Sequence, residues 1–249
     1  SGSGEKEFVG FLNYQYLFKD AVFLKSVVNT LIIWCLSTIP MVILALIFAF
    51  ILNLGTLKCK SVFRAVYFLP NVTSTVAVAI VFATMFASNY GLVNFLLTSL
   101  GMDPVKWMSV PFWVQFVIAL VVMWRWTGYN MVFYLSGLQN IEYSVYEAAK
   151  IDGANGWKTF WGITVPLLKP TIIMTFIMSI NGTLQLFDES VNLTNGGPAN
   201  ATITMSHYIY NTCFLRAPNF GYGSAMAFFV FIIVAILAFI NLKVGDTRD

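Results

Sequence analysis

The stretch YEAAKIDGANGWKTFWGITVPLLKP, residues 146–170, is the only extended polar segment between two long apolar runs of this chain. Its Gly, Lys and Thr suggest a phosphate-binding loop, in which the pattern G-x-x-x-x-G-K-[ST] wraps backbone amides around a phosphate. Gly153 and Gly156, however, are only three residues apart, and Trp157 precedes Lys158, where its ring would fill the space of the phosphate. The spacing therefore argues against nucleotide binding by this segment.

The same stretch predicts two short helices joined by a turn. Residues 145–151 (VYEAAKI) are good helix formers, and Gly153 can adopt the left-handed conformation that ends a helix. The second piece has aromatic residues at positions i, i+3 and i+4, the spacing of one apolar surface: Trp157, Phe160 and Trp161. Two interpretations stay open: a surface that docks into a groove of another protein, or an interfacial segment before the next span.

Composition places this segment in a membrane protein. The chain has 249 residues, of which 58% are hydrophobic and 10% charged, and its mean hydropathy is +0.76; soluble domains carry roughly 25% charged residues. Several runs reach the about 20 apolar residues that a helix needs to cross a bilayer. We predict an all-α integral membrane bundle with five spans, at about 27–53, 71–89, 112–137, 171–190 and 223–242.

The distribution of Lys and Arg predicts the topology, because cytoplasmic loops are enriched in both. One side carries Lys58, Lys60, Arg64, Lys150, Lys158, Lys169, Lys243 and Arg248. The other carries Lys106 and Arg216, together with Lys6, Lys19 and Lys25, which weaken the bias without reversing it. We therefore expect residues 243–249 to form a cytoplasmic tail. The formal charge of +3 is too small and too scattered to indicate nucleic acid.

Five spans that end in the cytoplasm put the N-terminus outside. The start SGSGEKEF shows no signal peptide, and SGSG resembles a flexible linker or a processing scar. We expect a preceding transmembrane helix to be missing or replaced. Residues 1–26 are then a linker and external interfacial segment, and residues 27–242 are the transmembrane domain.

The cysteines and the acidic residues predict neither a disulfide nor a metal site. Cys35 lies in a span, Cys59 in a cytoplasmic loop and Cys213 outside, so this topology allows no pair to bridge. No metal-ligand spacing is present. His207, the sole histidine, is expected at the outer surface or against a binding protein, since no paired base and nucleophile accompanies it.

Residues 147–166 resemble the EAA loop of binding-protein-dependent ABC importer permeases. That pattern is E-A-A, three residues, G, nine residues, then I-x-L-P. The matching residues are Glu147, Ala148, Ala149, Gly153, Ile163 and Pro166. Val165 replaces the usual leucine and keeps an apolar side chain. The wider stretch is similar to the maltose and glycerol-phosphate permease branch, which imports sugars and sugar derivatives.

Other stretches extend this resemblance over nearly the whole chain. They are FVGFLNYQYLFKD at 8–20, VVNTLI at 27–32, SVFRAVYFLP at 61–70 and LTNGGPANATITMSHYIYNTCF at 193–214. The resemblance implies the transmembrane domain of a type I ABC importer, with its EAA loop at about 141–169. The absent first helix is the departure from the family pattern.

The resemblance also implies partners. A separate ABC ATPase, which holds ATP and Mg, would contact the loop through Glu147, Ala148, Ala149, Asp152, Gly153, Ile163 and Pro166. This chain would have no ATPase site and no cofactor of its own. A second permease subunit and an extracellular sugar-binding protein would complete an importer in a bacterial or archaeal plasma membrane, working by alternating access.

Polar residues inside spans are candidates for the substrate path because they are costly in lipid. Asn130 and Tyr134 lie one turn apart, and two further i, i+4 pairs follow: Ser179 with Thr183, and Asn181 with Gln185. In the family, sugar contacts fall in these two spans. The alternative is hydrogen bonding between helices. Arg125, which lies between Trp124 and Trp126, is expected to be structural, and Asp188 and Glu189 are expected near the outer mouth.

Two other functions stay open. An ABC importer for another solute would share this architecture, and a secondary transporter or channel would need no ATPase. A membrane enzyme is disfavoured because no catalytic cluster is visible.

Overall fold

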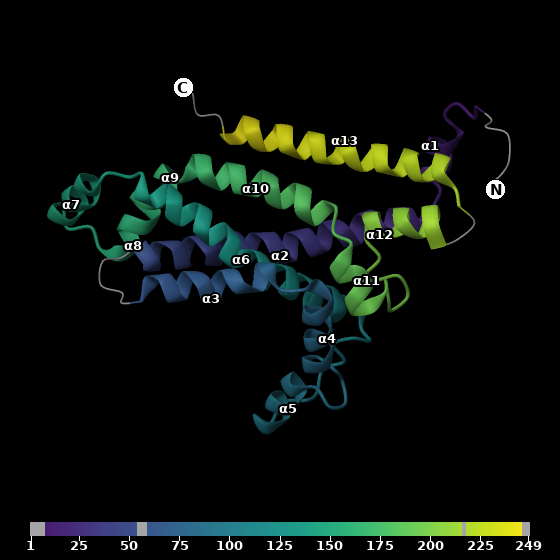
Figure 1. Cartoon of the computed structure of the whole chain (residues 1–249), viewed down its shortest axis with the longest axis horizontal. Coiled ribbons are helices and arrows are strands. Elements are labelled where there is room, and N and C mark those ends of the chain that lie inside the picture. The colour runs from purple at the N-terminus through teal and green to yellow at the C-terminus, as the bar shows by residue number, and fades with distance from the viewer. Residues whose placement is uncertain (1–7, 54–58, 216–217, 246–249) are drawn as a thin grey trace. The chain divides into compact units, whose positions relative to one another are not determined.

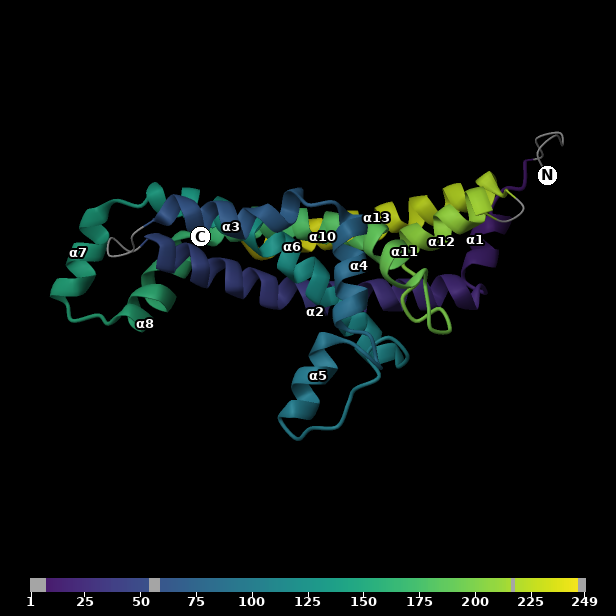
Figure 2. The ribbon, with the colours of Figure 1, turned by 60° about the horizontal axis from the view of Figure 1, so that its bottom comes forward.

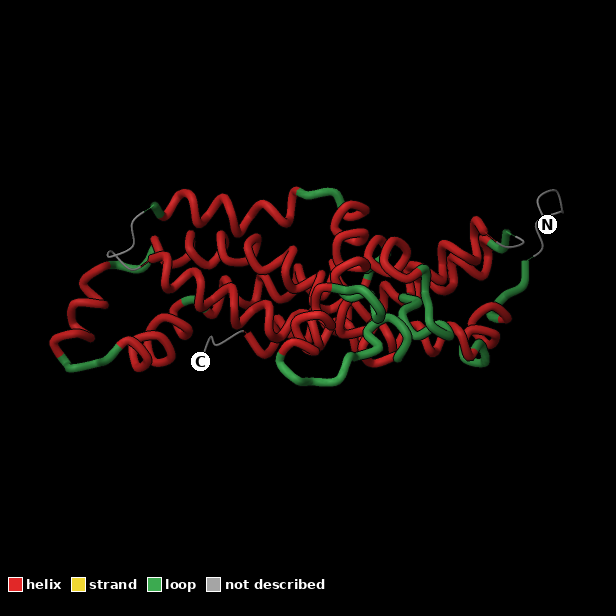
Figure 3. The backbone as a smooth tube through the Cα atoms, turned by 90° about the horizontal axis from the view of Figure 1, so that it is seen from below, coloured by secondary structure: helices red, strands yellow, loops and turns green. Residues whose placement is uncertain are grey.

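The structure is a computed structural model that describes residues 8–53, 59–215 and 218–245. These residues form helices and connecting loops, without strands, as Figure 3 shows. The helices are α1 (Leu12–Leu17), α2 (Ala21–Asn53), α3 (Lys60–Val72), α4 (Thr75–Met85), α5 (Leu92–Ser99), α6 (Pro111–Gln139), α7 (Tyr143–Ile151), α8 (Gly156–Thr159), α9 (Val165–Leu167), α10 (Lys169–Leu184), α11 (Asp188–Thr194), α12 (Met205–Tyr210) and α13 (Phe220–Gly245). Lys6, Lys58, Arg216, Arg248 and the SGSG segment lie outside the described residues. The predicted all-helical class is confirmed.

Three of the described helices are long and apolar enough to cross a membrane: α2, α6 and α13. The number rises to five if residues 60–85 and residues 156–184 each count as one broken span. Pro40 lies inside α2, which continues through it from Ala21 to Asn53.

Two predicted spans have the wrong limits. The second was predicted to begin at 71, but helix begins at Lys60 and breaks at Thr73, whose extended backbone (ψ 144°) separates α3 from α4. Pro70 lies near the end of α3. The fourth was predicted to reach 190, but α10 ends at Leu184 and α11 begins at Asp188.

The chain divides into two compact units, and several long helices contribute to both. Unit 1 holds residues up to Leu36, Ser74–Val122 and Ile180–Leu237. In its core, Leu17 and Phe23 pack with residues of α12 and α13: Tyr208, Tyr222 and Met226. In the same unit α11 packs against α4.

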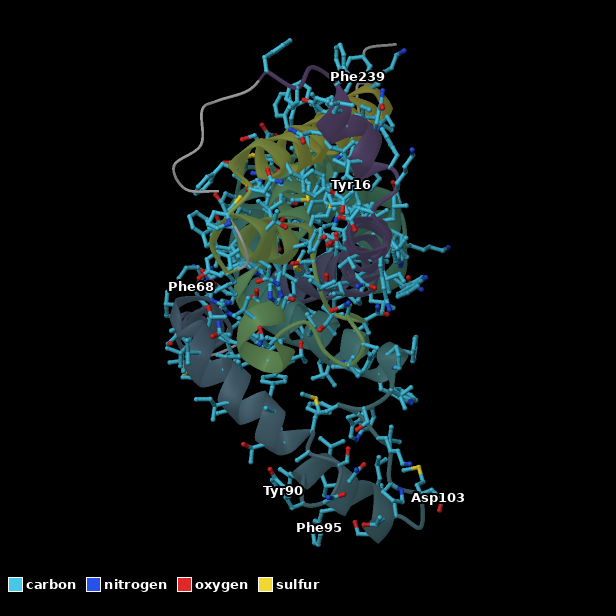
Figure 4. All side chains as sticks on the ribbon, turned by 90° about the vertical axis from the view of Figure 1, so that its right-hand side faces the viewer. Tyr16, Phe68, Tyr90, Phe95, Asp103 and Phe239 are labelled. Carbon is cyan, nitrogen blue, oxygen red and sulfur yellow. The ribbon has the colours of Figure 1, made fainter. Side chains whose placement is uncertain are left out.

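The segment between α4 and α6 in unit 1 contains the helix α5. Its fold depends on Asn94, which is buried. The Asn94 amide donates to the carbonyls of Ser88 and Val105, and its Oδ1 accepts from the Val105 N–H and the Trp107 indole N–H, all at 2.8–3.0 Å. Figure 4 shows Tyr90, Phe95 and Asp103 on the segment that Asn94 holds together.

We expect Asn94→Ala to destabilise this segment by about 1–3 kcal/mol, the usual cost of leaving buried donors unpaired. The melting temperature of the detergent-solubilised protein should fall, and residues 88–107 should become accessible to protease. Thr98→Ala is the matched control, because the Thr98 hydroxyl bonds only carbonyls of its own helix. Equal melting temperatures for both variants would contradict the role assigned to Asn94.

Unit 2 holds Ser37–Thr73, Met123–Ser179 and the residues after Leu237. Its core joins the second half of α2 to the second half of α6, with Leu46, Leu52, Met131 and Leu138 among the buried side chains. Figures 1 and 2 show α3 running beside this part of α2, and the rings of Phe48 and Tyr67 lie 4.7 Å apart there. The helices α7 and α8 lie beyond the ends of α2 and α6 in both views.

Candidate functional site

The predicted turn after α7 is present with its full hydrogen-bond pattern. Gly153 has φ +74°, the left-handed conformation that glycine adopts without strain. The Gly153 N–H donates to the Lys150 carbonyl at 3.2 Å, and the Ala154 N–H donates to the Ala149 carbonyl at 2.9 Å. This is the Schellman motif, which satisfies the last carbonyls of a helix. The α7 helix therefore ends in a rigid turn at Asp152 and Gly153.

The second helix of the pair starts with a side-chain cap. The Asn155 Oδ1 accepts from the Lys158 backbone N–H at 2.9 Å, and the chain continues through α8 into a π-helical turn, Phe160–Thr164. The Trp161 ring contacts the other two aromatic rings, with ring centroids 5.7 Å apart for Trp157–Trp161 and 5.1 Å apart for Phe160–Trp161.

These aromatics do not form a single exposed face as the spacing predicted. Trp157 and Trp161 are exposed, at 71% and 47%, but Phe160 is buried against Phe50, with ring centroids 5.2 Å apart. The π-helical turn changes the angle between successive side chains, so α-helical spacing does not describe it.

The EAA residues divide into an exposed and a buried set. Glu147, Ala148, Asp152 and Gly153 are exposed, Ala149 is buried, Ile163 is half-buried and Pro166 is exposed in α9. A pocket of about 530 Å³ separates α7 and α8 from the ends of α2 and α6. Its walls include Phe50, Leu138, Tyr146, Glu147, Lys150 and Gly156. The hairpin therefore presents two carboxylates, Glu147 and Asp152, and small side chains to solvent, beside a pocket of its own.

The α6 candidates for the substrate path are buried within unit 2. The Asn130 amide donates to the Trp126 carbonyl at 2.9 Å and lies 3.6 Å from the Met41 sulfur. The Tyr134 and Thr175 hydroxyls are 2.7 Å apart, which joins α6 to α10. These bonds favour the alternative of hydrogen bonding between helices, and contact with a substrate stays a prediction.

The remaining candidates lie on α10, except Gln185, which directly follows its last residue. Ser179 is half-buried and belongs to unit 2. In unit 1, Thr183 is buried, whereas Asn181 and Gln185 are exposed and joined by a hydrogen bond of 2.6 Å from the Gln185 amide to the Asn181 Oδ1. A role of these two residues in the substrate path stays a prediction.

The prediction for His207 was wrong. Its side chain is only 1% exposed, and its Nδ1 lies 2.8 Å from the Ser190 hydroxyl. Ser190 also donates to the Thr202 carbonyl at 2.6 Å. Burial lowers the pKa of His207, so this histidine is a neutral part of the network that packs the 195–204 loop. The two acidic residues that were expected near the outer mouth differ in exposure: Asp188 is exposed and Glu189 is buried.

Sequence reasoning missed the helix α5 and the buried hydrogen-bond networks around Asn94 and His207. The helix has a readable signal, since Leu92, Phe95, Leu96 and Ser99 follow helical spacing. No sequence pattern predicts the hydrogen-bond networks, because the residues that bond to each other are separated along the chain. Cys35, Cys59 and Cys213 are free, as predicted, and the described residues hold no cluster of three potential metal ligands.

The architecture is that of a polytopic helical membrane component with a helical hairpin beyond the ends of its long helices. The chain belongs to the family of binding-protein-dependent transport system inner membrane components, whose profile matches residues 23–245. The resemblance to the sugar-importer permeases is confirmed.

Three of the relatives are described as permease proteins of sugar transport systems. The lactose transport system permease protein LacF of Rhizobium radiobacter is 45% identical over 246 residues, which cover 97% of this chain and 82% of that protein. The arabinooligosaccharides transport system permease protein AraP of Bacillus subtilis is 35% identical, covering 98% and 78%. The trehalose/maltose transport system permease protein MalF of Thermococcus litoralis is 36% identical, covering 98% and 82%.

Two solved structures share the fold. A bacterial ABC transporter involved in the import of the acidic polysaccharide alginate has a TM-score of 0.85 and 23% identity, with 98% of this chain and 86% of that chain covered. A bacterial alginate ABC transporter in complex with an alginate pentasaccharide-bound periplasmic protein has a TM-score of 0.77 and 24% identity, covering 96% and 82%.

Proposed function

We propose that this chain is a permease subunit of an ATP-driven importer that moves a sugar or an oligosaccharide into the cytoplasm by alternating access. The observation that supports this most directly is the exposed α7–α8 hairpin with its Schellman turn. A rigid protrusion at the ends of membrane helices can carry movement from a separate subunit into the bundle. The sugar class is supported by the relatives that transport lactose, arabinooligosaccharides and trehalose or maltose.

The partners follow from the same proposal. A separate ATPase, which holds ATP and Mg, contacts the hairpin at Glu147 and Gly153, and an extracellular sugar-binding protein delivers the substrate. A second permease subunit completes the path. The C-terminus and the hairpin then face the cytoplasm, in agreement with the distribution of lysines on Lys150, Lys158 and Lys169.

The test is substrate uptake by the assembled transporter, co-expressed with its ATPase, partner permease and binding protein. Gly153→Val places a β-branched residue at φ +74° and strains the turn by about 1–3 kcal/mol. Because a loss of 1.4 kcal/mol in docking is about tenfold in affinity, we expect uptake and ATPase association to fall by about tenfold. Glu147→Ala should act in the same direction, while membrane insertion remains normal.

Gly162→Ala is the control, since a Cβ at Gly162 meets no atom within 4 Å. Normal uptake and normal ATPase association in Gly153→Val and Glu147→Ala would contradict the coupling role. Uptake that persists without any ATPase would instead identify a secondary transporter.

A further inference from the structure

His207, the sole histidine of the chain, holds one side of the 195–204 loop. The Ser190 hydroxyl has a single proton, which it donates to the Thr202 carbonyl at 2.6 Å. In its 2.8 Å contact with the Nδ1 of His207, this hydroxyl therefore accepts a hydrogen bond. A neutral imidazole carries one N–H, so the ring proton is on Nδ1 and the lone pair is on Nε2. Proton uptake by His207 can then take place only at Nε2.

The other side of the same loop is held by groups that acid does not change. Lys25 and Asn29 of α2 and Gln115 of α6 donate hydrogen bonds of 2.7–3.0 Å to backbone carbonyls of the loop. Amides do not titrate, and an ammonium group gains no further proton. The loop thus lies between anchors that are insensitive to acid, on α2 and α6, and an imidazole that acid can charge.

The imidazole is enclosed, with 1% of the side chain exposed. The Phe187 ring lies 6.0 Å away between centroids, and a Cβ added at Gly196 would lie 3.5 Å from the ring Cε1. Ser190, Phe187 and Gly196 do not titrate, and the 195–204 loop contains no titratable residue. The charged or titratable residues on the neighbouring described elements are Asp188 and Glu189 of α11, Tyr208 and Tyr210 of α12, Lys25 of α2, and Asp20, which accepts from the Tyr208 hydroxyl.

A proton at Nε2 would place a charge inside this enclosure, and burial of a charge is costly. For this reason burial lowers the pKa of His207 below its ordinary value of 6.5. The closed loop is therefore fully stable above pH 6.5, and it loses stability as the pH falls from 6.5 toward the lowered pKa. Within that window, each pH unit shifts the ratio of open to closed loop by up to about tenfold.

We propose that His207 is an acid-sensitive clasp of the 195–204 loop: protonation of Nε2 separates the loop from α11, while α2 and α6 keep their hold, and uptake slows in an acidic medium. The effect on uptake rests on the proposed function and on the external location that the sequence predicts for this loop. The opening of the loop rests on neither, so the two parts can be tested separately.

The first test needs no variant, because the chain has one histidine. The full chain, purified with a tag that contains no histidine and labelled with ¹⁵N-histidine, gives the imidazole signals of His207 alone. We expect the neutral tautomer with its proton on Nδ1 at pH 7, and proton uptake only below pH 6.5. A proton on Nε2 at pH 7, or a ring already charged there, would overturn the clasp.

The second test is hydrogen exchange of the 195–204 amides at pH 7 and at about pH 5, with the α5 amides of the same unit as the internal reference. Asp20 stays charged in this range because its pKa lies below 3.8. His207→Asn keeps a neutral N–H donor and cannot be charged. We expect acid to lower the protection of the loop by at least about threefold in the wild type and by less than about 1.5-fold in His207→Asn. Equal changes in both proteins would overturn the clasp.

The third test is sugar uptake by the assembled transporter at the same two external pH values. Each protein is compared with its own rate at pH 7, which removes any loss of folded His207→Asn from the comparison. We expect acid to slow wild-type uptake at least about threefold more than uptake by His207→Asn. An identical acid response would overturn the control of transport even if the loop opens. If the wild type transports no sugar at pH 7, the proposed function fails, and the first two tests still decide the clasp.

Discussion

Gly128→Ala should abolish the stable fold of unit 2. A Cβ at Gly128 would overlap the carbonyl group of Tyr67 and lie 3.0 Å from the Phe68 nitrogen. Those atoms are backbone, so no rotation of a side chain relieves the overlap, and α3 must move away from α6. Overpacking typically costs about 1–3 kcal/mol, and a rigid backbone clash belongs at or above the upper end of that range.

The measurement is the yield of monodisperse protein and its melting temperature in detergent. Gly182→Ala is the matched control, because it is also helical and its Cβ meets no atom within 4 Å. We expect a severe loss of folded protein for Gly128→Ala and little change for Gly182→Ala. A Gly128→Ala variant with wild-type melting behaviour would show that α3 and α6 are not in backbone contact.

Asp20→Ala should have the second large effect, in unit 1. The Asp20 Oδ1 accepts from the backbone N–H groups of Val22 and Phe23 at 2.9 and 3.2 Å, which caps the start of α2. Its Oδ2 accepts from the hydroxyls of Tyr208 and Tyr222, each at 2.7 Å. One carboxylate thus ties α2, α12 and α13 together. Hydrogen bonds to a charged group contribute about 1.5–3 kcal/mol each and are not additive, so we expect a loss of about 2–4 kcal/mol.

The loss appears as a lower melting temperature, and Tyr208→Phe and Tyr222→Phe should each reproduce part of it. Asp188→Ala is the control, because it removes an exposed carboxylate. If the Asp20→Ala and Asp188→Ala variants have the same melting temperature, the Asp20 carboxylate does not hold α2, α12 and α13 together.

The same carboxylate predicts a pH dependence. Burial raises the pKa of Asp20, and the hydrogen bonds from Tyr208, Tyr222, Phe23 and Val22 outweigh burial, so the pKa lies below its ordinary value of 3.8. A lowered pKa in the folded state means that the charged form stabilises the fold above pH 3.8, and that this contribution disappears as the pH falls through the folded pKa. The difference in melting temperature between wild type and Asp20→Asn should therefore be constant at neutral pH and shrink below about pH 4.

The class of the molecule and the α7–α8 hairpin could be predicted from sequence because both depend on local properties. Hydropathy over about 20 residues decides whether a helix can cross a bilayer, and glycine at position 153 is the residue that a left-handed helix end prefers. The helical class and the turn at Gly153 are confirmed for this reason.

Tertiary structure decided which side chains face inward. His207 and Phe160 are polar or aromatic residues of ordinary local pattern, yet one is buried beside Ser190 and the other against Phe50. Tyr208 and Tyr222 reach Asp20 from 188 and 202 residues away along the chain. No periodicity encodes such contacts, because a hydrogen bond between distant segments exists only once packing has brought them together.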